Sequence, residues 1–236
     1  MSLPRPTIVL FDMDGTTVRH VNPRMLGALE FLDDVIYKGA GLVRRARHEK
    51  PVPIALERPP QLAVHRILHS IRRKPVEQIV QPCPGIIALL NLFENYEIPM
   101  GIASNGLGAG YGHDILQKFD LEKYFVAQVF REDITHSKPH PESIIRTLRK
   151  IRDPLRADDV VWYIGDRHKD VIAALAADKA LPATVVPFAY GLKASIGILE
   201  RGLSPDHIIM NYTDFAARAA TVLADQSYRI MSRTGS

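Results

Sequence analysis

Short apolar runs alternate with stretches of helical spacing along most of the chain. Five compact runs, each bounded by turn or charged residues, are predicted to be buried strands: residues 7–11, 98–103, 126–130, 159–164 and 183–188. Five further stretches carry apolar residues at helical spacing: residues 85–95, 107–119, 141–151, 169–178 and 212–224. This alternation predicts an α/β fold in which a parallel sheet carries helices on both faces.

The alternation is interrupted after the first predicted strand. Residues 24–37 and 61–73 have the pattern of amphipathic helices, whereas the residues between them are rich in proline, glycine and arginine and show no period. An unstructured connection of about 20 residues is uncommon in a compact domain unless it is functional or mobile. Residues 18–80 are therefore predicted to form a small helical insert, which leaves residues 1–17 and 81–236 as the α/β core.

Composition narrows the class of protein. The chain has 236 residues, 46% hydrophobic and 24% charged, which is enough to bury a full core. Its apolar runs fall far short of the ~20 residues of a membrane helix, and Asp12 and Asp14 interrupt the first run, which argues against a signal peptide. Cys83 is the only cysteine, so an intramolecular disulfide is excluded and a small buried side chain is expected. We expect a cytoplasmic protein with no membrane partner, either a monomer or a homodimer.

Two aspartates follow the first predicted strand directly. In TIVLFDMDGTT (residues 7–17), alternation along the strand sends the side chains of Asp12 and Asp14 to the same side, and Gly15 permits a sharp turn. Two carboxylates placed together need a cation or a shared proton. The alternative is an ordinary turn with two hydrated aspartates.

Polar side chains also follow other predicted strands. Ser104 and Asn105 lie in IASNG after the second strand, Lys138 lies in HSKPHP before a helix, and Asp166 and Asp170 lie in YIGDRHKD after the fourth strand. Because ligands of parallel sheets bind at the carboxyl ends of the strands, we expect these side chains to meet. Together they are of the kind that a phosphoryl-transfer site uses.

Taken in order, FDMDGTT, ASNG, KPHP and GDRHKD resemble the four motifs of the haloacid dehalogenase superfamily. The resemblance spans residues 7–178 apart from the insert, and it is closest to the phosphatase branch, in particular to phosphoglycolate phosphatase-like proteins. It implies a Rossmann-like core, with the insert as a cap. It further implies a magnesium-dependent phosphoric monoester hydrolase that acts on a small phosphorylated metabolite.

The resemblance assigns a role to each motif residue. Asp12 is expected to be the nucleophile that forms an aspartyl phosphate. Mg²⁺ would be held by Asp12, the backbone carbonyl of Asp14 and Asp166. Asp170 would either help to hold the ligands around the Mg²⁺ ion or orient the side chain of Lys138.

The remaining roles concern protons and phosphoryl oxygens. Asp14 is expected to be the general acid and base, and because dehalogenating relatives lack an aspartate there, dehalogenation is disfavoured. Ser104 and Asn105 are expected to bind substrate, and Lys138 to neutralise growing negative charge. His140 is expected to be a loop residue.

The insert is where the sequence leaves most open. Residues 18–80 carry 12 Lys or Arg against 6 Asp or Glu, although the whole chain is only +4. Arg44, Arg45 and Arg47 could bind a second anionic group of a substrate or could form a hydrated surface. No fold signature supports a specific nucleic-acid partner. A phosphomutase of a sugar phosphate and a non-catalytic binding protein remain alternatives, and substrate identity is not readable.

Overall fold

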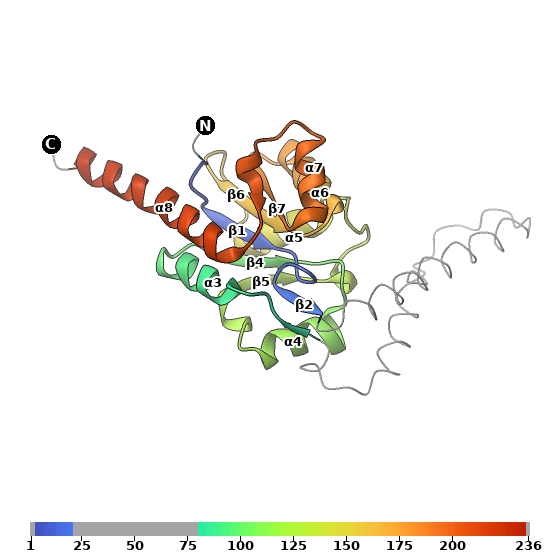
Figure 1. Ribbon diagram of the computed structural model, residues 1–236. Coiled ribbons are helices and arrows are strands. Elements are labelled where there is room, and N and C mark those ends of the chain that lie inside the picture. Colours follow the sequence, from blue (N-terminus) through green and yellow to red (C-terminus); the bar gives the residue numbers. More distant parts are fainter. Residues whose placement is uncertain (1–2, 21–79, 235–236) are drawn as a thin grey trace, which may run out of the picture. The chain divides into compact units, whose positions relative to one another are not determined.

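A six-stranded parallel sheet with helices on both faces is the centre of the protein (Figure 1). The computed structural model describes residues 3–20 and 80–234. The strands stand in the order β5-β4-β1-β6-β7-β8, and all neighbours are parallel. Their bounds are β1 Ile8–Phe11, β4 Met100–Ala103, β5 Phe125–Val129, β6 Val160–Gly165, β7 Thr184–Tyr190 and β8 Ile208–Ile209. The predicted α/β class is confirmed.

Six α-helices are described around this sheet. They are α3 Ile86–Asn95, α4 His113–Lys118, α5 Glu142–Ile151, α6 His168–Ala180, α7 Leu192–Leu199 and α8 Tyr212–Thr234. Short helical turns lie at Gly108–Gly112, Glu122–Tyr124, Arg131–Asp133 and Pro205–His207. The helix predicted from residue 107 has regular geometry only from His113, because Ala109 and Gly110 have non-helical dihedral angles in the glycine-rich stretch before it.

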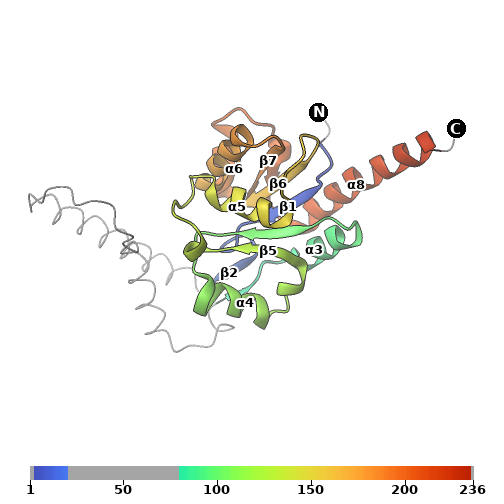
Figure 2. The ribbon, with the colours of Figure 1, turned by 180° about the vertical axis from the view of Figure 1, so that it is seen from behind.

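The two faces of the sheet are packed differently. Side chains of β1 alternate, so Ile8 and Leu10 lie in one buried cluster with Ile144 and Leu148 of α5. The same cluster includes three alanines of α6, namely Ala173, Ala174 and Ala177. Figure 2 shows α5 and α6 on this side of the sheet. Small alanine side chains allow α6 to approach the strands closely.

The opposite face of the sheet is aromatic. Phe11 of β1 lies 6.4 Å from Phe93 of α3 between ring centroids. Trp162 of β6 is fully buried. Its ring centroid lies 6.2 Å from that of Phe93 and 5.7 Å from that of Phe215 of α8. These large rings fix α3 and α8 against the sheet. β1 and β6, which lead to the candidate site, are therefore packed between α5 and α6 on one face and α3 and α8 on the other, which limits their movement.

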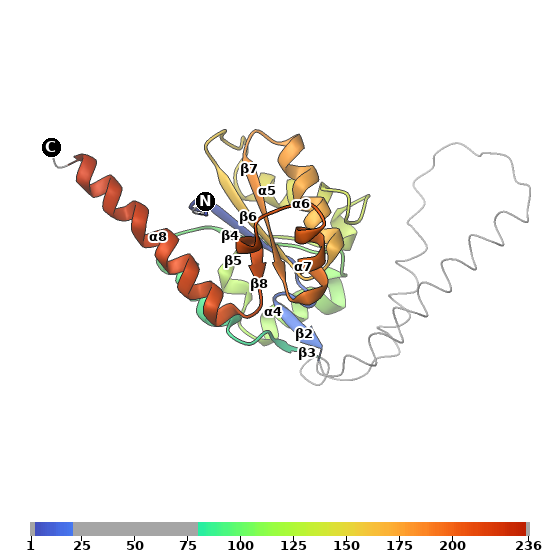
Figure 3. The same cartoon turned by 45° about the horizontal axis from the view of Figure 1, so that its top comes forward.

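A separate two-stranded sheet pairs β2 (Val18–His20) with β3 (Val80–Pro82) (Figure 3). These strands flank the predicted insert. Apart from His20, the described residues belong to a unit that comprises residues 1–19 and 80–236. Residues 21–79, with Arg44, Arg45 and Arg47, lie outside the described residues, so the cap and its boundaries stay predictions. Among the described helices, none combines the length and apolar character needed to cross a membrane.

Candidate active site

Polar side chains from several elements meet at the carboxyl edge of the sheet. Asp12 follows β1, Asp166 follows β6, and Asp170 lies in the first turn of α6. Lys138 comes from the loop before α5, and Ser104 follows β4. Because all these strands are parallel, their ends open on the same side, as the sequence predicted. β1 lies between β4 and β6, so Asp12 is at the centre of the group.

Lys138 connects the two sides of the site. Its side chain is almost fully buried, and its ammonium nitrogen lies 2.5 Å from Oδ1 of Asp12 and 2.7 Å from Oδ1 of Asp170. It also donates to the hydroxyl of Tyr163 at 2.7 Å. An ammonium group has three donors, so all three are used and the nitrogen is fixed in direction.

The electrostatics of the site favour a positive charge. Burial would lower the pKa of Lys138, but the carboxylates of Asp12 and Asp170 raise it above its ordinary value, so the side chain stays charged. The pKa of Asp12 is raised to about 8: burial is the largest cause, the charge of Lys138 opposes it, and the charges of Asp170 and Asp166 add to it. Two buried carboxylates, of Asp12 and Asp170, and the partly exposed carboxylate of Asp166 thus surround Lys138, and a further cation would relieve their mutual repulsion.

The carboxylates have the arrangement that a divalent cation needs. Oxygens of Asp12, Asp166 and Asp170 all lie within 4.8 Å of one another. Oδ1 of Asp166 is buried and has no hydrogen-bond partner among the described residues. Burial, followed by repulsion from Asp170, raises the pKa of Asp166 to about 6. This Asp166 oxygen accepts no hydrogen bond from the described residues, although Nε of Arg167 lies 3.9 Å from it, and it lies beside the carboxylate of Asp12. Such a pair of hard oxygen donors fits Mg²⁺, which takes one or two carboxylates and keeps several waters.

Asp170 has little capacity left for a metal. Its Oδ1 accepts from Lys138 at 2.7 Å and from the hydroxyl of Tyr163 at 2.9 Å. Its Oδ2 accepts from the backbone N–H of Arg167 at 3.0 Å, at the start of α6. Of the two roles predicted for Asp170, these contacts favour orientation of Lys138.

The turn after β1 brings its backbone close to Asp166. Gly15 has φ +83°, in the left-handed region, and a Cβ atom at this position would overlap the carboxylate of Asp166. Only glycine meets both conditions without strain. The hydroxyl of Thr17 donates to the backbone carbonyl of Asp12 at 2.8 Å and secures the same turn.

Asp14 and Ser104 both lie close to Gly106, where a Cβ atom would be 3.0 Å from Oδ2 of Asp14 and 3.3 Å from Oγ of Ser104. Oδ1 of Asp14 accepts from the hydroxyl of Tyr111 at 2.6 Å. Ser104 is buried, and its Oγ accepts from the backbone N–H of Gly106 at 2.9 Å. Because that bond uses a lone pair of Oγ, the hydroxyl hydrogen of Ser104 is available for a phosphoryl oxygen.

Asn105 contacts the lysine loop. Its Oδ1 accepts from the backbone N–H of Lys138 at 2.9 Å, and its Nδ2 donates to the backbone carbonyl of the same residue at 3.5 Å. Both ends of the amide therefore hold the backbone of Lys138 in place. These contacts favour a positioning role over the predicted substrate contact.

The sequence reasoning missed three side chains that the structure places in the site. Tyr163 carried a signal, because a buried tyrosine in an apolar strand usually has a hydrogen-bond partner for its hydroxyl. Thr17 was in the first motif but received no role. Tyr111 lies in an irregular glycine-rich stretch, and nothing in the local pattern indicated a contact with Asp14.

Comparisons with known proteins give consistent results. The model of the haloacid dehalogenase-like hydrolase family matches residues 43–181. A phosphoglycolate phosphatase from Agrobacterium fabrum is 28% identical, with 92% of this chain and 92% of that protein covered. Pyrophosphatase PpaX from Oceanobacillus iheyensis is 23% identical, with 87% of this chain and 93% of that protein covered.

Solved structures share the fold. A HAD-superfamily hydrolase from Ehrlichia chaffeensis matches with a TM-score of 0.57 and 20% identity, covering 94% of this chain and 100% of its own. A protein from Thermotoga maritima, proposed to be a β-phosphoglucomutase, matches with a TM-score of 0.57 and 19% identity. The match covers 95% of this chain and 99% of that protein. At such identities the likeness supports the fold.

Proposed function

The chain belongs to the haloacid dehalogenase-like hydrolase family, and from this premise we propose that it is a magnesium-dependent phosphatase of a small phosphorylated metabolite. The resemblance drawn from the four motifs is thereby confirmed, and the relatives named as phosphatases support the predicted enzyme class. The observation that carries the proposal is the buried group in which Lys138 bridges Asp12 and Asp170 beside the orphaned oxygen of Asp166.

Asp12 is the proposed nucleophile. A carboxylate oxygen of Asp12 attacks phosphorus, the ester P–O bond breaks, and an aspartyl phosphate forms on Asp12. Lys138 holds Oδ1 of Asp12 at 2.5 Å, which fixes the carboxylate before attack. Mg²⁺, held by Asp12, Asp166 and the backbone carbonyl of Asp14, would supply positive charge that screens the two anions from each other.

Asp14 is the proposed general acid and base. It donates a proton to the leaving alkoxide in the first step and takes a proton from water in the second. That water attacks phosphorus, the P–O bond to Asp12 breaks, and phosphate leaves with the carboxylate regenerated. The hydrogen bond from Tyr111 to Oδ1 of Asp14 orients this carboxyl group, so Tyr111 is a positioning residue.

Ser104 and Lys138 are proposed to bind the phosphoryl oxygens. The hydroxyl hydrogen of Ser104 is available for this purpose, and the charge of Lys138 offsets negative charge that grows during transfer. Asn105, Asp170 and Tyr163 act through Lys138 by fixing its backbone or its ammonium group. We place them as positioning residues.

The alternatives have less support. Phosphomutase neighbours share 19% identity or less, which shows the fold alone, whereas the curated relatives at 23% and 28% identity are named as hydrolases. A non-catalytic binding protein would have no need of the complete group of Asp12, Asp14 and Lys138. The cytoplasmic location and the monomeric or dimeric state stay predictions from the sequence.

Phosphate release from a substrate panel tests the function. The protein, first treated with a chelator, is assayed on phosphoglycolate, pyrophosphate, sugar phosphates and nucleotides with and without Mg²⁺. We expect release of inorganic phosphate from at least one monoester with Mg²⁺, none in chelator, and poor activity with Ca²⁺, whose looser coordination disturbs in-line geometry. Conversion of a sugar 1-phosphate to its 6-phosphate without release would indicate a mutase, and full activity in chelator would contradict the metal requirement.

A further inference from the structure

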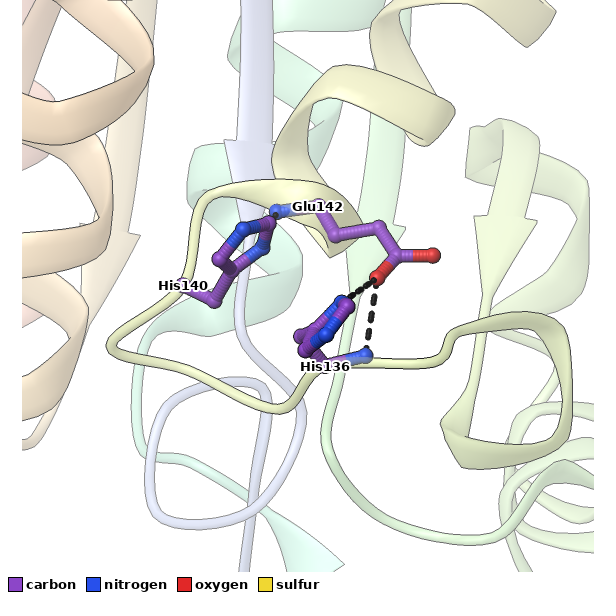
Figure 4. A group of neighbouring side chains, drawn as sticks. All are labelled: His136, His140 and Glu142. Carbon is purple, nitrogen blue, oxygen red and sulfur yellow. Dashed lines mark hydrogen bonds and ion pairs between the residues drawn. The ribbon is translucent and has the colours of Figure 1, made fainter. Parts of the chain in front are cut away.

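A second group of metal-ligating side chains lies on the loop that carries Lys138. His136, His140 and Glu142 come from the last turn before α5 and from its first residue (Figure 4). One ligand atom from each lies within 4.8 Å of the others. Both histidines are exposed, whereas the Glu142 side chain is only 13% exposed. The group thus joins two accessible imidazoles to one largely buried carboxylate.

The carboxylate of Glu142 is held in place and charged. Its Oε1 accepts from the backbone N–H of Thr135 at 3.0 Å and pairs with Arg146 at 2.8 Å. Its Oε2 accepts from the backbone N–H of His136 at 2.8 Å. Burial tends to raise the pKa of Glu142, but hydrogen bonds from two backbone N–H groups and the His136 side chain, with the charge of Arg146, outweigh it and lower the pKa to about 2. A fixed, ionised oxygen is therefore present at any working pH.

The spacing between His136 and Glu142 suits coordination to one ion. Nδ1 of His136 lies 3.1 Å from Oε2 of Glu142. With metal–ligand bonds of about 2.1 Å, this separation corresponds to an N–metal–O angle of roughly 95°. The ion would replace the proton between these two atoms and use a free lone pair of Oε2. Thr135 and Arg146 can keep their bonds to Oε1, so coordination needs no rearrangement there.

His140 can complete the group. Its ring centroid lies 4.7 Å from that of His136, with 35° between the planes. Nδ1 of His140 accepts from the backbone N–H of Glu142 at 3.3 Å. Two donors opposite each other on one ion are about 4.2 Å apart, so a rotation of the exposed His140 ring that gives up this long bond brings a ring nitrogen within range. His140 and Glu142 also line an open hollow of about 790 Å³, through which an ion and its waters can enter.

We propose that His136, His140 and Glu142 bind a divalent transition-metal ion such as Zn²⁺, Ni²⁺ or Co²⁺. Imidazole nitrogens favour these ions over Mg²⁺, which prefers oxygen donors such as those of Asp12 and Asp166. The two sites therefore take different classes of ion. Lys138 lies between the two histidines in the sequence, so the ion would cross-link the loop that presents the site lysine.

Ni²⁺ binding in the presence of excess Mg²⁺ tests this site. Equilibrium dialysis compares the wild-type chain with His136→Ala, His140→Ala and the double variant. His113→Ala is the matched control, because His113 is also exposed but lies at the start of α4. We expect the double variant to bind one Ni²⁺ fewer than the wild type, and each single variant to bind that ion at least about tenfold more weakly, whereas the control binds as the wild type does.

Two further measurements guard against a folding artefact. In chelator the single variants should melt close to the wild type, since exposed contacts such as that between His136 and Glu142 contribute little to stability. If one single variant melts lower, the binding comparison uses the other single variant. Ni²⁺ should raise the melting temperature of the wild type and leave that of the double variant unchanged. Equal Ni²⁺ stoichiometry and affinity in the wild type and the double variant would overturn the proposal.

Discussion

The phenolic oxygen of Tyr163 lies 2.7 Å from the ammonium nitrogen of Lys138. It accepts from that group and donates to Asp170 at 2.9 Å. Burial, followed by the negative charge of Asp170, raises the pKa of Tyr163 well above its ordinary value, so the hydroxyl stays neutral and keeps its hydrogen. The hydroxyl of Tyr163 thus links the ammonium group of Lys138 to the carboxylate of Asp170.

Replacing this hydroxyl tests how strongly the position of Lys138 matters. Tyr163→Phe leaves one N–H of a buried ammonium group without an acceptor, and we expect a loss of stability of about 1–3 kcal/mol. We also expect kcat to fall roughly tenfold, since a misplaced ammonium group no longer fixes Asp12. Urea unfolding and steady-state kinetics measure the two effects.

Tyr124→Phe is a matched control for that experiment. Tyr124 is also buried and donates to Asn91 at 2.6 Å, but it lies in the turn before β5. It should lose some stability and keep its kcat. Similar losses of kcat in both variants would assign the effect to general destabilisation.

The nucleophile has its own test. Asp12→Asn is nearly isosteric, but an amide is a poor nucleophile, so we expect kcat to fall by at least about 10⁴-fold. Phosphate release is the measurement, and circular dichroism verifies the fold. Substantial remaining turnover in a folded variant would exclude Asp12 as the nucleophile.

Stability without metal should depend on pH through Asp166. Its pKa rises from 3.8 to about 6 on folding, so between these values the folded state binds more protons than the unfolded state. The contribution of Asp166 to the free energy of unfolding should therefore fall as pH rises from about 4 through about 6, by on the order of 3 kcal/mol. Added Mg²⁺ should restore stability at high pH.

Asp166→Asn removes this titration and should make the metal-free protein more stable above pH 6. Urea unfolding in chelator at pH 5 and pH 8 measures the difference. Asp158→Asn makes the same change at an exposed carboxylate and should keep the wild-type pH dependence. Parallel slopes for the wild type and Asp166→Asn would contradict the assignment of the shift to Asp166.

The basic residues of the predicted cap are tested by substrate comparison. If Arg44, Arg45 and Arg47 bind a remote group of the substrate, replacing all three by Ala should lower kcat/KM for the best panel substrate by roughly ten- to a hundredfold. p-Nitrophenyl phosphate lacks that group and should react nearly unchanged. An equal effect on both substrates, or none on either, would indicate that these arginines form a hydrated surface and do not bind the substrate.

Much of the core could be predicted from the sequence because its strands are compact and fully buried. Ile8–Phe11 and Val160–Ile164 are apolar at every position, which is typical of a central parallel strand. α7 and β8 were missed, and so were β2 and β3, which lie at the two ends of the range predicted as a helical insert. β8 has only two residues, and α7 is short and carries exposed apolar side chains such as Leu192, so neither has the period that marks a longer element.

The site was predictable where residues stand at strand ends and unpredictable where they meet across space. Asp12, Lys138 and Asp170 were expected to converge because parallel strands open at one edge. The contact between Tyr111 and Asp14 spans 97 positions and depends on the irregular turns of the glycine-rich stretch. The spacing of apolar and polar residues along the chain does not predict a contact between residues so far apart, so it is seen only in the structure.

The pairing of β2 with β3 has a consequence for how this architecture can change. The chain leaves the core and returns to it through neighbouring strands, so the core already holds both attachment points together. Lengthening a flexible connection between fixed ends costs only about 0.6 kcal/mol for each doubling of its length. Such a junction can receive segments of different size and composition without redesign of the sheet. If the segment between β2 and β3 selects the substrate, as proposed, selectivity can diversify by exchange of that segment while the core that carries the site residues is inherited intact.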